Sequence, residues 1–269
     1  MQVWRLLDTG SNNGFYNMAV DEAIAIASKE GRVKTTTLRF YRWSPPCMSI
    51  GYFQKMDEVA LTFMVGSKWG MNPNATAWQN RGSSDEDIAV VRRITGGRAV
   101  FHGNDLSYSI VSKTDNPLFP SNIKGTYHAI AEALISGLKH LGIIPDPLLI
   151  SHPAPRTPHS TLNPQPSAFR IPHSAFCTQP YRHSTLCFDT TLGHEVCMNG
   201  RKIIGSAQRR WKDMFLQHGS MLLSDRNHEA IISSLSVGFC ETFGIKLAEE
   251  ELTSYEKELT ERFIEEKYS

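Results

Sequence analysis

The feature that most constrains this chain is the dipeptide Asn199-Gly200, which lies between two segments rich in strand-forming residues. Asn-Gly accepts the positive backbone angles of a two-residue hairpin turn, so the chain is expected to reverse direction here. The pattern predicts a strand over 194–198, a return strand over 201–211 and, after a second turn, a third strand over 214–223. A three-stranded antiparallel meander is therefore the first element of the expected fold.

Helical and strand patterns surround the meander. Residues 17–28 combine a broad apolar face with acidic residues near the start, which predicts a helix, and 129–141 predict a second amphipathic helix. Shorter strands are expected over 38–41, 48–52, 88–93, 99–102 and 106–111, with the first two joined by the turn at Ser44-Pro45-Pro46. Two more helices are expected near the end, over about 228–243 and 248–268.

Two stretches interrupt these patterns. Residues 64–87 are polar and rich in Asn, Gly and Ser, which predicts a surface insertion. Residues 145–180 contain most of the prolines of the chain and show almost no periodicity, so they cannot bury enough apolar surface to stay compact alone. A loop of that length inside a compact domain is either functional or disordered.

Composition excludes several classes of protein. The formal net charge is +1, which gives no argument for nucleic-acid binding, and no apolar run approaches the roughly 20 residues that span a bilayer. The start of the chain lacks the apolar core of a secretory signal. Five cysteines without CxxC spacing favour neither a disulfide framework nor a metal site, which suits a reducing cytoplasm. From the cysteines, the net charge and the absence of a long apolar run together, we expect a cytoplasmic protein that binds no nucleic acid and no membrane.

A double-glycine loop follows the strand expected over 88–93. Paired glycines let the backbone approach a ligand closely, and their N–H groups can hold an oxyanion or phosphate. The alternative is a tight hairpin turn with solvated arginines, and the residues alone leave both interpretations open. The candidate binding residues in this loop are Arg92, Arg93, Thr95, Gly96, Gly97, Arg98 and His102.

The meander carries two further candidate groups. On a regular strand Lys202 shares a face with Ile204 and Ser206, and a lysine beside small residues suits a site where a ligand approaches the sheet. An exposed lysine is the common alternative, and His218 on the next strand is either an acid–base group or a structural histidine. The candidates on these strands are Lys202, Gly205, Ser206, Ala207 and His218.

Cys187 is the fourth candidate. It stands where the proline-rich stretch gives way to the meander, near Arg182 and His183, and a nearby cation raises the thiolate fraction of a cysteine. The residue pattern alone does not single it out from the other four cysteines. Three of those lie in apolar contexts and one lies inside the proline-rich stretch: Cys47, Cys197, Cys240 and Cys177.

Taken in this order, the pieces resemble the lipoate/biotin protein ligase superfamily, and more narrowly its cysteine-dependent octanoyltransferases. The resemblance covers the helix at 17–23, the strands at 37–54, the arginine-rich glycine loop at 92–109 and the lysine strand with its partner at 200–209 and 216–223. It implies an α+β fold, in which a mixed, largely antiparallel β-sheet is flanked by α-helices. It also implies a single catalytic domain over 1–269, with inserts at 64–87 and 145–180 and a helical C-terminal tail over 226–269.

The same resemblance separates two branches of the family. ATP-dependent lipoate ligases usually show three consecutive glycines, where this chain has Gly96-Gly97-Arg98, and commonly carry an additional C-terminal domain. The Cys-Phe pair before the lysine strand is similar to the transferase branch, so the resemblance favours Cys187 as the nucleophile. The chain departs from the family at Ile94, which replaces a common proline, at Gly103, which replaces a polar residue, and in its two long inserts.

The resemblance implies a reaction in two steps. Cys187 takes octanoyl from octanoyl-acyl carrier protein, and a lysine of a lipoyl domain or of a glycine-cleavage carrier protein then receives it. Backbone N–H groups near Gly96 and Gly97, or near Cys187, stabilise the oxyanion. Lys202 lies over the carbonyl or thiolate as a cation and helps to deprotonate the amine, and neither metal nor ATP is needed. The stretch over 145–180 is expected to be either a cover over the acyl site or an idle insertion.

Three alternatives stay open at this point. An amidotransferase would move octanoyl between two lipoyl-type proteins with the same cysteine and lysine. An ATP-dependent lipoate or biotin ligase would use ATP and would not need the cysteine. A non-catalytic relative would bind an acylated carrier protein without turnover.

Overall fold

The structure is a computed structural model that describes residues 1–57, 78–79, 87–148, 195–223 and 227–268. The insertion predicted at 64–87 and the proline-rich stretch lie almost wholly outside these described residues. Cys177 and Cys187 also lie outside them.

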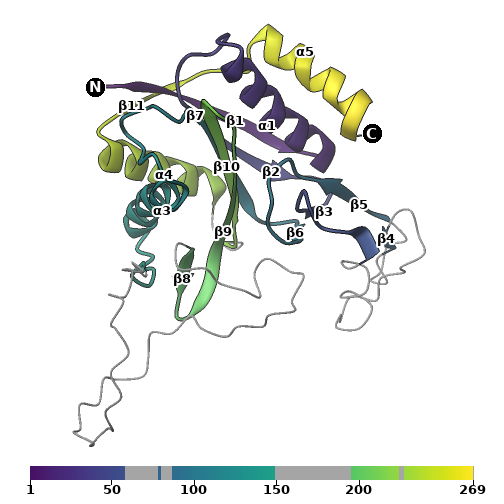
Figure 1. Cartoon of the computed structure of the whole chain (residues 1–269). Helices are drawn as coiled ribbons and strands as arrows, with labels where there is room; N and C mark the ends of the chain where they lie inside the picture. The colour runs from purple at the N-terminus through teal and green to yellow at the C-terminus, as the bar shows by residue number, and fades with distance from the viewer. Residues whose placement is uncertain (58–77, 80–86, 149–194, 224–226, 269) are drawn as a thin grey trace, which may run out of the picture.

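Two mixed sheets form the centre of the fold (Figure 1). In the larger sheet β1 runs parallel to β11 and β2, and the remaining neighbours are antiparallel. In the smaller sheet β3 and β5 are parallel, and their outer neighbours are antiparallel. The predicted α+β fold with a mixed, largely antiparallel sheet is confirmed. The larger sheet has the order β11 (Lys246–Glu249), β1 (Val3–Asn12), β2 (Thr37–Trp43), β7 (Leu106–Lys113), β10 (Met214–Met221), β9 (Arg201–Arg210), β8 (Val196–Met198), and the smaller has β4 (Trp78–Gln79), β5 (Asp87–Arg92), β3 (Cys47–Ile50), β6 (Val100–His102).

Helices cover both faces of the larger sheet. Figure 1 shows α3 (Ile123–His140) with α4 (His228–Phe243) on one face, and α1 (Gly14–Lys29) with α5 (Ser254–Phe263) on the other. A short π-helical turn, Ile264–Tyr268, continues α5. The helices bury their apolar faces against the sheet, which is what holds such layers together.

The two faces of the central strands differ in polarity. Successive strand residues point to opposite faces, and Phe40 and Tyr108 lie in the apolar core with residues of α3 and α4. The alternate positions of the same strands include Arg39, Ser107 and Ser109, which are buried all the same. A buried polar face requires hydrogen-bonding partners, so it marks the side of the sheet on which a site can form.

The meander is confirmed at its turn. Asn199 and Gly200 have φ angles of 53° and 72°, as a two-residue hairpin requires, and β8, β9 and β10 are consecutive antiparallel neighbours. The strands expected over 38–41 and 48–52, joined by the proline turn, are present as β2 and β3, and they belong to different sheets. The turn carries the chain from one sheet to the other.

The end of the chain differs from the sequence prediction. The segment from 248 was expected to be helical, but residues 246–249 form the edge strand β11, which pairs with β1. Strand β1 was not predicted from the sequence either. The helix starts only at Ser254, where Thr253 and Glu256 form a reciprocal capping box. Helix periodicity after 248 could not reveal a strand whose partner lies at the opposite end of the sequence.

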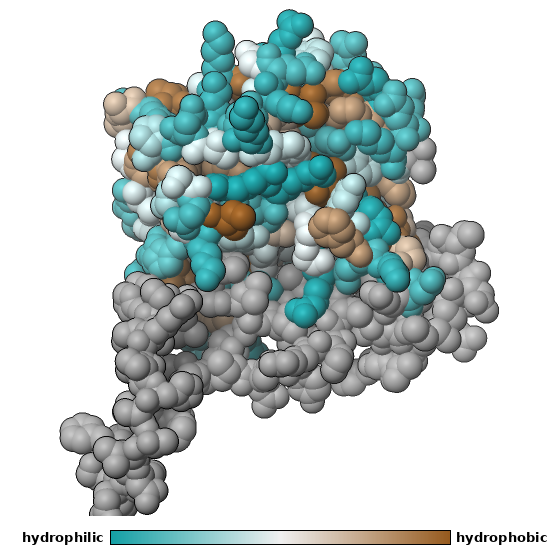
Figure 2. Space-filling model, viewed as in Figure 1, coloured by the Kyte–Doolittle hydropathy of each residue, from teal (hydrophilic) through white to brown (hydrophobic). Residues whose placement is uncertain are grey.

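The described surface is largely polar on the face that Figure 2 shows, with hydrophobic side chains in small groups among hydrophilic ones. Within the described part of the chain, no helix has the length and apolar character that crossing a membrane requires.

Candidate active site

One pocket forms where α1, β2, the small sheet and the meander meet. Met18 on α1, Tyr41 and Trp43 on β2, and Val100 on β6 supply its apolar side. Polar side chains, three glycines and one alanine complete the lining: Ser49, Arg93, Gly97, His102, Gly205, Ser206, Ala207, His218, Gly219 and Ser220. A pocket with one apolar side and a few fixed polar groups is the usual form of a small-molecule site.

The double-glycine loop closes one side of this pocket. Gly97 has φ of 91°, a conformation that side chains other than glycine rarely adopt, which confirms the need for glycine there. The strand end at Gly51 packs directly against this loop, and a Cβ atom on Gly51 would overlap the carbonyl oxygen of Gly97. The backbone of Tyr52 also donates to the Thr95 carbonyl at 2.8 Å, so the loop and β3 form one unit.

The arginines of this loop bind backbone carbonyls. Arg93 is buried and donates to Ser49 O at 2.8 Å, Gly96 O at 3.1 Å and Arg98 O at 2.9 Å. Arg92 donates to the carbonyls of residues 51, 52 and 54. The interpretation of a turn with merely solvated arginines is therefore wrong for Arg93, which braces the loop against the small sheet.

A carboxylate–histidine–hydroxyl chain crosses the floor of the pocket. His218 Nδ1 lies 3.0 Å from Asp21 Oδ2, and His218 Nε2 lies 2.6 Å from Thr95 Oγ1. Burial lowers the pKa of His218 below its usual 6.5, although the carboxylate of Asp21 acts in the opposite direction. A neutral His218 then donates from Nδ1 to Asp21 and accepts from Thr95, which fixes the orientation of the ring.

Asp21 is the centre of this network. Its Oδ1 accepts from Arg39 at 2.6 Å and from Ser109 at 2.7 Å, while the Tyr41 hydroxyl donates to Oδ2 at 3.1 Å. Burial opposes ionisation, but the Arg39 guanidinium and the hydrogen bonds from His218 and Ser109 outweigh it, so the pKa of Asp21 falls below 3.8. The floor of the pocket therefore rests on an ionised, fully paired carboxylate.

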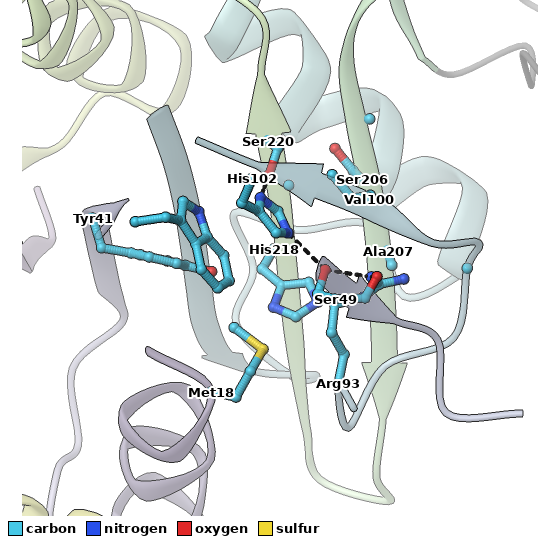
Figure 3. A pocket seen from close by; sticks show the side chains of 14 residues that line it. Met18, Tyr41, Ser49, Arg93, Val100, His102, Ser206, Ala207, His218 and Ser220 are labelled. Atoms are coloured by element: carbon cyan, nitrogen blue, oxygen red, sulfur yellow. Dashed lines mark hydrogen bonds between the residues drawn. The ribbon is translucent and has the colours of Figure 1, made fainter. Parts of the chain in front are cut away.

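A second chain of the same kind lies beside the first. His102 Nδ1 is 2.8 Å from Asp105 Oδ2, and Nε2 is 2.6 Å from Ser49 Oγ, which accepts from Arg93 at 2.7 Å. The Trp43 ring stacks on the His102 ring with centroids 3.7 Å apart. Figure 3 shows His102 and His218 in the middle of the pocket, with Met18 and Tyr41 on one side and Ser49 and Arg93 on the other.

Both chains have the same electrostatic consequence. The pKa of Asp105 is lowered as well. Burial alone would raise this pKa, but the attraction to His102 and the hydrogen bonds from His102 and Gly103 together outweigh the effect of burial. Each carboxylate is thus satisfied from within, and the pocket presents oriented imidazoles and hydroxyls. Such a lining accepts an uncharged chain and can still bond a polar group at a fixed place.

Lys202 lies on β9, three residues before Gly205 of the pocket. A register shift in the pairing of β8 and β9 makes Cys197 the partner of Lys202 and Val196 the partner of Ile204. Lys202 therefore does not share a face with Ile204, which corrects the expected alternation of this strand. Its Nζ forms an ion pair with Glu195 Oε1 at 2.5 Å, and both side chains are buried.

The structure gathers most of the predicted site residues. Those that line the pocket are Arg93, Gly97, His102, Gly205, Ser206, Ala207 and His218, while Thr95 and Gly96 bond to lining residues. Arg92 and Arg98 lie in the same loop without lining the pocket, and Cys187 lies outside the described residues. Among the described residues, no group of three His, Cys, Asp or Glu side chains could hold a metal ion.

Sequence analysis missed five polar residues that the structure brings to this region: Asp21, Tyr41, Ser49, Asp105 and Glu195. Only Asp21 gave a signal, because it is an acidic residue within a strongly apolar helix. It was placed near the start of that helix without a role, and the structure shows that it is buried.

The mixed sheet, the pocket and the glycine loop are those of a lipoyl protein ligase-type catalytic domain, and comparison with protein-family models confirms this class. The model for the lipoyl protein ligase A/B catalytic domain matches residues 13–233, and the chain belongs to this family. The match spans the pocket, both histidine chains and the lysine strand.

Curated relatives narrow the comparison. The chain is 36% identical to octanoyltransferase LipM of Moorella thermoacetica and 39% identical to that of Clostridioides difficile, in alignments that cover 83% of this chain and 66% of each relative. It therefore spans just under two thirds of the length of these two proteins. A LipM of Kyrpidia tusciae is 32% identical, with 98% of this chain and 96% of the relative covered.

Solved structures show the same fold. A crystal structure of lipoate-protein ligase A bound with ATP is 23% identical with a TM-score of 0.66, covering all of this chain and 96% of the other. A putative lipoate protein ligase from T. acidophilum with bound lipoic acid gives the same identity and TM-score, covering all of this chain and 97% of the other.

Proposed function

We propose that this protein is an octanoyltransferase of protein lipoylation in the cytoplasm. It would move octanoyl from octanoyl-acyl carrier protein to a lysine of a lipoyl-domain protein or of a glycine-cleavage carrier protein. The observation that carries the proposal is the 32–39% identity to three proteins named octanoyltransferase LipM, over 83% of the chain or more. The apolar side of the pocket, formed by Met18, Tyr41, Trp43 and Val100, suits a saturated acyl chain.

The proposed reaction has two balanced steps. The Cys187 thiol gives up its proton as its sulfur attacks the thioester carbonyl, the carbon–sulfur bond to the carrier breaks, the carrier sulfur takes up that proton and leaves as a thiol, and octanoyl-Cys187 results. The acceptor amine then attacks this second thioester, the carbon–sulfur bond breaks, and the proton lost by the amine returns to the sulfur of Cys187. Backbone N–H groups of Gly96 and Gly97 stabilise the oxyanion, and Lys202 supplies positive charge. No ATP enters, because a thioester is already activated.

The test is intact-mass analysis after incubation with octanoyl-carrier protein, with and without ATP. Wild type is expected to gain the mass of one octanoyl group without ATP, and Cys187→Ser is expected to gain none. Lys202→Ala is expected to keep its fold and to lose transfer to a lipoyl domain. A fully active Cys187→Ala variant would remove the acyl-cysteine from the mechanism.

The choice of donor tests the alternatives in the same assay. Transfer only from an octanoylated carrier protein, with its amide as donor, would make the protein an amidotransferase. Labelling only from free octanoate or lipoate with ATP, with release of pyrophosphate, would make it a ligase. Binding of the acylated carrier protein without turnover would leave a binding protein.

A further inference from the structure

A tight turn over residues 51–54 follows β3 and lies beside the glycine loop. The Gln54 N–H donates to the Gly51 carbonyl, and the Gly51 N–H donates to Gln54 Oε1, both at 3.0 Å. Arg92 Nη1 donates to the carbonyls of residues 51, 52 and 54 at 3.0, 3.1 and 2.7 Å. These bonds give the turn a fixed shape, so its two central residues, Tyr52 and Phe53, are displayed in a fixed direction.

The side chains on this turn are large, apolar and exposed. Phe53 is 86% exposed and Tyr52 is 48% exposed, and Met56 shortly after the turn is 36% exposed. The two rings meet edge to face, with centroids 5.0 Å apart. Contact between water and apolar area is unfavourable, so three such side chains held close together on a rigid segment mark a surface that a partner covers.

The turn stands at the mouth of the pocket. Among the lining residues Gly97 is exposed and Ala207 is half-buried, whereas Ser49 and His102 are buried. The pocket therefore opens at the glycine loop. Gly51 packs directly against Gly97, so the exposed rings lie next to the opening through which an acyl chain would enter.

Positive charge frames the turn. Arg209 lies over the Tyr52 ring, 5.3 Å from its centre, and donates to a carbonyl of the glycine loop at 3.1 Å. Arg92, which braces the turn, and Lys55, which follows it, are exposed. Against these cations the described part of the segment from 51 to 57 sets one carboxylate, that of Asp57. An apolar centre with a positive rim fits a partner that carries an apolar spot among acidic side chains.

We propose that this aromatic turn, formed by Tyr52, Phe53 and Met56, is the docking surface for the acyl donor, an acidic carrier protein that holds octanoyl on a flexible arm. The inference rests on the proposed function. Phe53 packs on an apolar spot of the carrier, while Arg92 and Lys55 attract its acidic side chains. The donor fits better than the acceptor domain, because the arm of an acyl carrier protein is attached through a phosphodiester, a further anion for the arginines at the mouth.

The first experiment measures formation of octanoyl-enzyme by intact mass at varied concentrations of octanoyl-acyl carrier protein. Phe53→Ser is expected to lower the second-order rate constant about tenfold, with little change in the rate at saturation, because Phe53 contacts the carrier and not the reacting atoms. With octanoyl-N-acetylcysteamine, a thioester without a protein, the variant should react like wild type. Val237→Ser is the matched control, since Val237 is also exposed but lies on α4, on the face of the larger sheet away from the pocket.

Lys55→Glu tests the positive rim. The variant should lower the second-order rate constant with the carrier protein and weaken its dependence on NaCl, because an attractive charge becomes repulsive. Lys34→Glu is the control, since Lys34 is an exposed lysine that precedes β2, at the end of that strand away from Trp43 of the pocket. An equal fall in both variants would reduce the effect to the net charge of the protein and overturn the role of the rim.

Direct binding separates docking from catalysis. Fluorescence anisotropy of dye-labelled octanoyl-acyl carrier protein should give a Kd about tenfold weaker for Phe53→Ser than for wild type. With an active wild type, an equal Kd or an equal donor rate in Phe53→Ser would overturn the docking surface. A loss with the small thioester would do the same, because the turn would then shape the pocket.

Two further outcomes separate the partners and the proposals. A loss confined to transfer from octanoyl-enzyme to a lipoyl domain would assign the surface to the acceptor and overturn the choice of the donor. If wild type forms no octanoyl-enzyme while the Kd values differ, the proposed function fails and the docking surface stands.

Discussion

Replacement of Asp21 by asparagine is expected to cost this protein a large part of its stability. Asp21 accepts four hydrogen bonds, two at each oxygen, from Arg39, Ser109, Tyr41 and His218. An asparagine of the same shape replaces one oxygen by an NH2 group, which faces two donors and loses both bonds. At about 1.5–3 kcal/mol for each bond to a charged group, the loss is about 3–6 kcal/mol.

The loss has a pH dependence of known sign. The pKa of Asp21 in the folded protein lies below the ordinary value of 3.8. A lowered carboxyl pKa contributes stability that is fully present above the unfolded value and is lost as pH falls through the folded value. Wild type should therefore exceed Asp21→Asn by a constant margin above about pH 5, and the margin should shrink below about pH 4.

Urea denaturation followed by far-UV circular dichroism measures both quantities, with Asp8→Asn as the matched control. Asp8 pairs with Arg42 at 3.1 Å, but these side chains are 40% and 22% exposed, so its replacement should cost less than about 1 kcal/mol. A loss below about 1 kcal/mol in Asp21→Asn, equal to that of the control, would refute the argument. A margin that grows as pH falls would refute its electrostatic part.

Two further predictions concern the glycine loop. Gly51→Ala should cost about 1–3 kcal/mol of unfolding free energy, because its Cβ would overlap Gly97 O. Gly96→Ala is the control, because a Cβ there meets open space and should cost less. Equal urea midpoints for the two variants would contradict the packing argument. Arg93→Ala should lower stability by about 3 kcal/mol or more, since several buried carbonyls lose their donor. Its activity loss should be independent of salt, and recovery of activity in 0.5 M NaCl would indicate surface steering instead.

Local signals account for what the sequence could predict. The Asn199-Gly200 turn, the strands of the meander and the positive φ of Gly97 depend on residues within a few positions, and all three are present. The glycine loop and the lysine strand were also identified as parts of one site, although they come from separate regions of the sequence. That step came from resemblance to a family and not from periodicity.

The remaining parts depend on partners that no local pattern encodes. Helix periodicity shows that one face around Asp21 is apolar, but not that Arg39 and His218 lie opposite it. The face taken by Lys202 depends on a bulge that no residue between 196 and 204 marks. Ser49 enters the site only because β3 belongs to the smaller sheet and not to the larger sheet that contains β2. The proline turn between the two strands did not reveal this change of sheet.

The pairing of β1 with β11 has a consequence for synthesis on the ribosome. Arg5 on β1 bonds Glu256 on α5, 251 residues further along the chain, and α5 with its π-helical turn packs on α1, which carries Met18 of the pocket. At about 5–20 residues per second, roughly 13–50 seconds separate the emergence of β1 from that of its last partners. During this interval one edge of β1 is unpaired, and such edges recruit other strands. The nascent chain is therefore expected to need protection at this edge until residues 246–249 have emerged.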